Sequence, residues 1–369
     1  MKRKLIASLL LLSILSGCVP SSIVDDILII EGEGYDYIGH GKIIGTVTMP
    51  NFVQGGEPGS QGAGLPTTGS MIRSLSGVTY DGKSLADHFQ PEGQKILRAG
   101  KIRLMLFNER LAKHGVAKDI AFRNRDPDPP LDITIAVVKG SCKQLLTATD
   151  YQTQIPISRY VQDLIMQNSQ QNLPDVNLVT FINSYYGSYM DPFMPLIEKQ
   201  GDHIKLDGLA LFRHDKYVLS LGNNQTFVFK MLYQPFNQGV YDYQIKPGKH
   251  VALRNVKTSV SYSAKDGNSA SPDITAHVKV VAQVRQASPN TVSKQTAPIV
   301  SQAFSKHMAK EARRLVSRLQ KKRIDPLQLT NYIRSFTHHF NGSDWRERYA
   351  HVRFHCKVNV LITQTGISH

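Results

Sequence analysis

The sequence predicts a multi-domain protein of the α+β class, with strands and helices mixed along the chain. In the first half, short β-branched runs such as Asp132–Lys139 alternate with helical segments. The second half contains longer strands and the longest amphipathic helix, Ser301–Lys322. With 369 residues and 41% hydrophobic content, the chain is long enough to bury the cores of two or three domains.

The N-terminus has the layout of a secretory signal. A basic start, Met1–Lys4, precedes an apolar run, Leu5–Leu15, which is too short to span a bilayer as a helix. The run ends in Leu-Ser-Gly-Cys, with the cysteine at Cys18, and this resembles the lipobox of bacterial lipoproteins. The resemblance implies removal of residues 1–17 and acylation of Cys18 by a thioether-linked diacylglycerol and an N-acyl chain. The alternative is an ordinary secreted protein whose cysteine lies there by accident.

The charge and the cysteines limit the possible partners. The formal net charge is +15, and loss of Lys2, Arg3 and Lys4 with the signal leaves about +12. A tethered, exported protein meets no nucleic acid, so we expect attraction to anionic lipid head groups or to an acidic partner. Besides Cys18 there are only Cys142 and Cys356. A disulfide between these two is possible in an exported protein, but the sequence favours buried free thiols.

The N-terminal region, residues 18–195, is predicted to be α/β, with two subdomains. Asn108 is expected to cap the helix that follows it. Glu31–Gly34 is interpreted as a turn, residues 50–70 as a flexible Gly-rich surface loop, and Pro192 and Pro195 as a break. Strands are expected at Ile23–Ile30, Lys42–Met49, Met71–Tyr80, Lys101–Phe107 and Asp132–Lys139. Helical segments are expected from Ser84 and at Glu109–His114, Ile120–Arg125, Cys142–Thr149, Ile157–Gln170 and Val176–Tyr189.

The C-terminal domain, residues 196–369, is predicted to pack an antiparallel sheet against long helices. Gly208 lies inside the first strand, where it would permit close backbone packing. Strands are expected at His203–Arg213, Lys216–Leu219, Val251–Ser263, Ile274–Arg285 and His351–Thr363. Helices are expected at Asn223–Tyr233, Ser301–Lys322 and Leu327–Phe340. The apolar positions of the second of these follow one helical face: Phe304, Met308, Ala312, Leu315, Val316 and Leu319.

Two groups of residues are candidates for contact with a partner or a membrane. The long helix carries many basic residues, of which Lys306, Lys310, Arg313 and Arg314 are the candidates, against one acid, Glu311. The plainer interpretation is a solvated outer face. Tyr185 and Tyr186 belong to an aromatic group with Tyr189 and Phe193, which suits an interface anchor or the packing between two domains.

The sequence contains no motif that predicts catalysis, a cofactor or a metal. It has no Gly-x-Ser-x-Gly, no P-loop, no Cys-x-x-Cys and no His-Glu-x-x-His. His338 and His339 are neighbours on a predicted helix, where their side chains would point about 100° apart and would not share a metal. We therefore expect a protein that is not an enzyme.

Four segments, taken in order, resemble one known family, the Ger(x)C lipoproteins, which are the C subunits of spore germinant receptors. They cover nearly the whole mature chain, although Val19-Pro20 stands where family members often have Trp-Asp. The segments are the strand and helix from Lys101 to Asp126, the Asp-Pro approach and Gly-Leu-Ala-Leu-Phe strand in Tyr185–Lys216, the basic helix ending Lys321–Leu327, and Trp345 with the Val-rich strand after it.

The resemblance implies a split N-terminal domain, an adjoining second piece and a C-terminal sheet-and-helix domain. It also implies a non-catalytic, lipid-anchored subunit that is required for nutrient-triggered germination. The partners would be two integral membrane subunits, of the A and B types, at the spore inner membrane, with this chain on the extracytoplasmic side. The alternative from the sequence is a solute-binding lipoprotein of an ABC-type importer, which would be encoded beside a permease and an ATPase.

Overall fold

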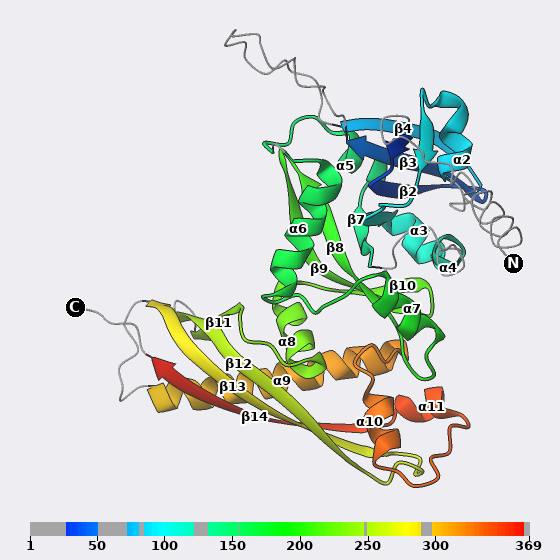
Figure 1. Ribbon diagram of the computed structural model, residues 1–369. Helices are drawn as coiled ribbons and strands as arrows, with labels where there is room; N and C mark the ends of the chain where they lie inside the picture. Colours follow the sequence, from blue (N-terminus) through cyan, green and yellow to red (C-terminus); the bar gives the residue numbers. More distant parts are fainter. Residues whose placement is uncertain are drawn as a thin grey trace, which may run out of the picture.

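The computed structural model describes residues 27–50, 72–80, 85–121, 132–153, 155–246, 249–288 and 297–364. They form an eight-stranded sheet with helices on both faces and a four-stranded sheet with one long helix (Figure 1). A two-stranded parallel ribbon pairs β1 (Ile27–Ile29) with β5 (Ile96–Arg98). This arrangement confirms the predicted α+β class. Among the described residues, no helix has both the length and the apolar character needed to cross a bilayer.

The eight-stranded sheet is parallel at its centre and antiparallel at both sides. Its strands, in spatial order, are β10 (Lys216–Leu221), β9 (His203–Arg213), β8 (Phe193–Gln200), β7 (Thr134–Lys139), β6 (Leu104–Asn108), β2 (Gly32–Gly39), β3 (Lys42–Pro50) and β4 (Ile72–Thr79). The pairs from β8 through β2 are parallel, and the others are antiparallel.

Alternate residues of the central strands supply two separate cores. Leu104 and Leu106 of β6 face one core, while Met105 and Phe107 face the other, as the two-residue period of a strand requires. The first core packs against α5 (Cys142–Thr147), α6 (Ile157–Ser169) and α8 (Asn223–Tyr233). The second packs against α2 (Leu85–Phe89), α3 (Glu109–His114), α4 (Ala117–Ala121) and α7 (Leu178–Tyr186).

The long helix α9 (Ala297–Lys322) packs along one face of the four-stranded sheet (Figure 1). Its strands, in spatial order, are β11 (Val240–Lys246), β12 (Lys249–Lys265), β13 (Asp273–Ser288) and β14 (Arg353–Gln364). Two short helices, α10 (Leu329–Ser335) and α11 (Trp345–Tyr349), lie between α9 and β14. The six apolar residues predicted to form one face of α9 are all buried, from Phe304 to Leu319, so that prediction is confirmed.

The sheet is mixed, so the prediction of an antiparallel C-terminal sheet is wrong for its last strand. β14 pairs with β13 in parallel, from Asp273–Arg353 to Ala282–Ile362. The physical reason is the connection: α9 carries the chain back along the sheet, so β14 begins at the same end as β13. The outer edge of β14 is covered by α9, because Ser305 accepts a hydrogen bond from the Val360 N–H at 3.2 Å and Ser301 donates to its carbonyl.

Three local predictions are wrong. Glu31–Gly34 is not a turn, because Gly32–Gly39 forms the central strand β2. Pro192 and Pro195 do not mark a break, because strand β8 begins directly after Pro192 and contains Pro195. Pro195 is tolerated in the strand because pairing with β7 begins one residue later, at Leu196. The helix expected at Leu327–Phe340 ends at Ser335, and His338 and His339 beyond it stack their rings at 4.1 Å.

The expected boundary between residues 195 and 196 falls inside β8, and the sheet continues through β9 and β10. The division into residues 18–195 and 196–369 does not coincide with the edge of a sheet, and it stays a prediction. Residues 1–26, which include the signal and Cys18, and most of the Gly-rich loop 50–70 lie outside the described residues.

Candidate functional site

The two halves of the molecule meet at a pair of aspartates, each followed by proline. Asp191 ends the turn after α7, and Asp325 follows α9. The Asp191 carboxylate accepts hydrogen bonds from the Asp325 N–H at 2.8 Å and from the His214 N–H at 3.0 Å. One side chain thus joins the β9–β10 hairpin of the large sheet to the end of the long helix. Burial raises the pKa of Asp191 above its usual range.

Asp325 is buried and organises the loop that leads into α10. Its carboxylate accepts from the Leu329 N–H at 2.9 Å, the Thr330 N–H at 2.7 Å and the Thr330 hydroxyl at 2.6 Å. The Trp345 indole N–H donates to the same Thr330 hydroxyl at 2.8 Å. Burial raises the pKa of Asp325 to about 6, although these hydrogen bonds oppose the shift. The lone tryptophan of the chain is therefore tied to the junction.

A polar pocket of about 580 Å³ opens at this junction. Tyr185 and Tyr186 line it from the end of α7, and Arg346 lines it from α11, with its guanidinium 3.9 Å from the Asp191 carboxylate. Four lining residues have left-handed backbone angles: Tyr189, His214, Arg323 and Asp344. The predicted tyrosine pair is thus at an interface between two parts of this chain. Phe193, predicted with it, packs elsewhere, against Phe229 and Tyr233.

A second contact joins the C-terminal end of α6 to α8 and to the start of the smaller sheet. The buried Lys230 ammonium of α8 donates to the carbonyls of Ser169 at 2.5 Å and Gln171 at 2.8 Å. A cation is favourable there because the last carbonyls of a helix lack partners within the helix. Burial lowers the pKa of Lys230 to about 8. The Asn172 amide bonds to both backbone groups of Val240, the first residue of β11.

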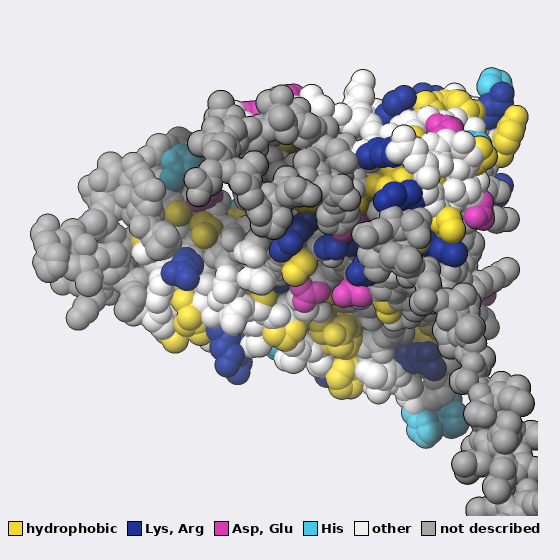
Figure 2. All heavy atoms as spheres, turned by 45° about the horizontal axis from the view of Figure 1, so that its top comes forward, with side chains coloured by type: hydrophobic (Ala, Val, Ile, Leu, Met, Phe, Trp, Pro, Cys, Tyr) yellow, Lys and Arg dark blue, Asp and Glu magenta, His cyan; other side chains and the backbone are white. Residues whose placement is uncertain are grey.

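The four basic residues predicted on α9, Lys306, Lys310, Arg313 and Arg314, recur at i, i+4, i+7 and i+8, so they lie along one side of the helix. All four are exposed. Arg314 is paired with Glu311 at 2.6 Å, beside a small cavity next to α8. None of the four lines the pocket that contains Tyr185 and Tyr186. Figure 2 shows Lys and Arg side chains interspersed with acidic and apolar ones on the face in view. The proposed contact role of these six residues stays a prediction.

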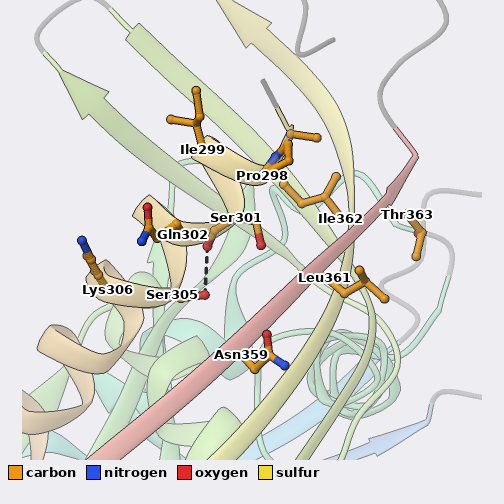
Figure 3. A pocket seen from close by; sticks show the side chains of 11 residues that line it. Pro298, Ile299, Ser301, Gln302, Ser305, Lys306, Asn359, Leu361, Ile362 and Thr363 are labelled. Atoms are coloured by element: carbon orange, nitrogen blue, oxygen red, sulfur yellow. Dashed lines mark hydrogen bonds between the residues drawn. The ribbon is translucent and has the colours of Figure 1, made fainter. Parts of the chain in front are cut away.

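An open groove of about 920 Å³ lies between the first turns of α9 and the end of β14 (Figure 3). Pro298, Ile299 and Lys306 border it from the helix, and Leu361 and Ile362 border it from the strand. Ile299 and Leu361 are 68% and 60% exposed, which is unusual for such large apolar side chains. The hydrogen bond between Ser305 and the Ser301 carbonyl, drawn in Figure 3, belongs to the cover over β14.

No three His, Cys, Asp or Glu side chains in the described ranges gather as metal ligands. Cys142 and Cys356 are buried free thiols, as predicted. Burial raises the pKa of Cys356 to about 12 and that of Cys142 well above its usual range, as apolar surroundings do for a structural thiol.

Sequence reasoning missed the aspartate junction, although two Asp-Pro dipeptides marked it. Pro192 was interpreted as part of a break and Asp191-Pro192 as part of a family segment, and nothing local indicates that residues 191 and 325 meet. Cys18, the predicted lipidation site, lies outside the described residues.

Comparison with known proteins settles the relationship. Residues 20–199 match the family described as the N-terminal domain of spore germination proteins, and residues 207–366 match the family described as spore germination B3/GerAC-like, C-terminal. The chain belongs to the Ger(x)C family. It is thus a C subunit of the germinant receptors that act in spore germination.

Individual relatives of this Ger(x)C protein match it over almost its full length. The spore germination protein GerQC of Bacillus cereus is 29% identical, with 99% of each chain covered. The putative spore germination protein YfkR of Bacillus subtilis (strain 168) is 24% identical, with 99% of this chain and 97% of that protein covered. The crystal structure of the GerBC protein has the same fold, with a TM-score of 0.57 at 14% identity over 90% of this chain and 96% of that one.

Proposed function

We propose that this chain is the lipid-anchored, non-catalytic subunit of a nutrient germinant receptor and is required to trigger germination. The observation that carries the proposal is the match of both halves of the chain, in order, to spore germination families. The Leu-Ser-Gly-Cys sequence ending at Cys18 supports the anchor, since two or more acyl chains hold a protein stably on a bilayer. Family membership favours this function over the importer alternative.

In this proposal the chain lies on the extracytoplasmic side of the spore inner membrane and assembles with two integral membrane subunits, of the A and B types. The nutrient is bound by the complex rather than by a catalytic site in this chain. The junction supports a scaffolding role, because the Asp191 and Asp325 carboxylates are occupied by hydrogen bonds between the two halves.

The anchor is tested by fractionating spores that carry Cys18→Ala in place of the wild-type chain. The matched control is Cys142→Ala, because Cys142 is a buried thiol inside the fold. We expect Cys18→Ala to leave the membrane fraction and to lose metabolic labelling by a fatty-acid analogue, while the control stays labelled and membrane-bound. A Cys18→Ala chain that remains labelled would contradict the lipid anchor.

A further inference from the structure

The smaller sheet leaves one of its faces uncovered by the described residues. α9, α8 and α10 pack on the inner face, which carries Val260, Tyr262 and Val278. Figure 1 shows α9 along that side and no helix on the other. Since β12–β14 are the longest strands of the molecule, this outer face is an extended surface.

The register of the three strands fixes which residues are neighbours on the outer face. Along the face, the rows across β12, β13 and β14 are Lys257–Val281–Leu361, Ser259–Lys279–Asn359, Ser261–His277–Lys357, Ser263–Thr275–His355 and Lys265–Asp273–Arg353. Successive rows are two residues apart, so all these side chains point to the same side of the sheet.

Three lysines form a diagonal line across this face. Lys257, Lys279 and Lys357 occupy successive rows on successive strands, and all three are exposed. Diagonal neighbours in a sheet are about 7–8 Å apart. That spacing is within one Debye length at physiological salt, about 8 Å, so the three charges repel one another.

The face contains almost no compensating negative charge. Its acid, Asp273, is already held by Arg353 at 2.6 Å and by His355 at 3.3 Å. None of the ion pairs between described residues involves Lys257, Lys279 or Lys357. A sheet with one solvated face needs polar residues there, but it does not need a line of like charges, because neighbouring like charges repel each other.

We propose that this outer face docks an extended acidic segment of a partner protein, with carboxylates on alternate residues laid along the Lys257–Lys279–Lys357 diagonal. Side chains on the same side of an extended chain recur about every 6.6–6.8 Å, which matches the spacing of the lysines. Ser259 and Ser261 are small, so a backbone can approach β12 closely, and their hydroxyls can bond to the peptide groups of that backbone. The Ser263 hydroxyl is already hydrogen-bonded to His277 at 3.2 Å.

The geometry favours a peptide segment over a lipid surface. Neighbouring strands twist by roughly 20–25°, so a planar bilayer would touch only part of this long face, whereas an extended chain can follow the diagonal. The surface does not depend on the proposed lipid anchor; only the identity of the partner as a receptor subunit rests on the proposed function.

The test uses the full chain with Cys18→Ala, so that no acyl chain contributes, and a fluorescent peptide of alternating Glu and Ser. The test variant replaces Lys257, Lys279 and Lys357 together with Gln. The matched control replaces Lys101, Lys118 and Lys143, three exposed lysines around the larger sheet, with Gln, which removes the same charge. A third variant, with the same three sheet lysines changed to Arg, keeps the charge. Fluorescence anisotropy is measured at low and at high salt.

We expect the sheet variant to weaken peptide binding by about tenfold at low salt, and the Lys101/Lys118/Lys143 control and the Arg variant to stay within about twofold of wild type. Equal loss in the sheet variant and in that control would overturn the proposal, as would equal affinity for a peptide with its Glu residues in one block. Absence of binding to the alternating peptide would also overturn it. Tighter, lysine-dependent binding to phosphatidylglycerol vesicles would assign the face to lipid instead.

Discussion

Asn172 holds both backbone groups of Val240. Its side-chain oxygen accepts from the Val240 N–H at 3.2 Å, and its amide nitrogen donates to the Val240 carbonyl at 2.9 Å. In this way the loop after α6 takes the place of a neighbouring strand at the outer edge of β11. Ser301 and Ser305 of α9 do the same for Val360 at the opposite edge of the sheet. Side chains of the same molecule thus bond to backbone groups at both edges of the smaller sheet, where another strand would otherwise pair.

We expect Asn172→Ala to lower the free energy of unfolding by about 1 kcal/mol, because it removes two partly exposed hydrogen bonds. Amide hydrogen exchange at Val240 should accelerate in the same variant, since its N–H loses its acceptor. Gln167→Ala, on the exposed side of α6, is the control and should change neither quantity. Unchanged exchange at Val240 in Asn172→Ala would show that this contact does not hold the edge.

Gly208 is expected to be far less tolerant of substitution than a glycine with a similar backbone. Its φ is +123°, and a Cβ there would overlap the Leu221 carbonyl oxygen of β10. Gly140, at φ +97°, has nothing within 4 Å of its Cβ position. Gly140→Ala should therefore cost only backbone strain, about 1–3 kcal/mol. Urea unfolding should show a larger loss in Gly208→Ala; equal losses would mean that the close approach to β10 does not matter.

Asp325 should make the stability of the junction depend on pH. Its pKa of about 6 in the folded protein lies above the unfolded value near 3.9. Folding therefore favours the protonated carboxyl, so its contribution to stability is fully present below about pH 4 and is lost as the pH rises through about 6. Asp325→Asn cannot titrate, and it serves as the reference.

Urea unfolding of wild type and Asp325→Asn, measured from about pH 4 to about pH 7, cancels the titration of groups that do not interact with Asp325. Relative to the variant, wild type should lose stability by on the order of 2 kcal/mol across that range. Parallel stability profiles for the two proteins would show that the Asp325 carboxyl does not change its protonation state on folding.

Periodicity and local signals predicted much of the fold. The apolar stripe of α9 is buried as expected, and Asn108 caps α3 by accepting from the Leu111 N–H at 2.8 Å. The β9 strand at His203–Arg213 and the α8 helix at Asn223–Tyr233 have the predicted bounds. These features depend on residues close together in the chain, so the sequence carries their signals directly.

The failures arise where tertiary packing overrides local signals. Gly32 and Gly34 resembled turn residues, yet they lie in a strand that pairs with β3 and β6. A Cβ at Gly34 would lie 2.9 Å from the Cβ of Cys142 on α5, so close packing explains the glycine there. The missing side chain allows the helix to approach the sheet. The Asp191–Asp325 contact joins residues 134 positions apart, and the lysine diagonal depends on the register of three strands. Neither arrangement can be derived from local patterns.

The central claim, that this chain is a required subunit of a nutrient receptor, is tested most directly by spores that lack only this chain. Release of dipicolinate is followed after exposure to amino acids, sugars and nucleosides, with the wild-type gene restored in a parallel strain. The account predicts loss of the response to one nutrient class and its recovery on restoration. An undiminished response to every nutrient, in spores without any other receptor, would contradict it.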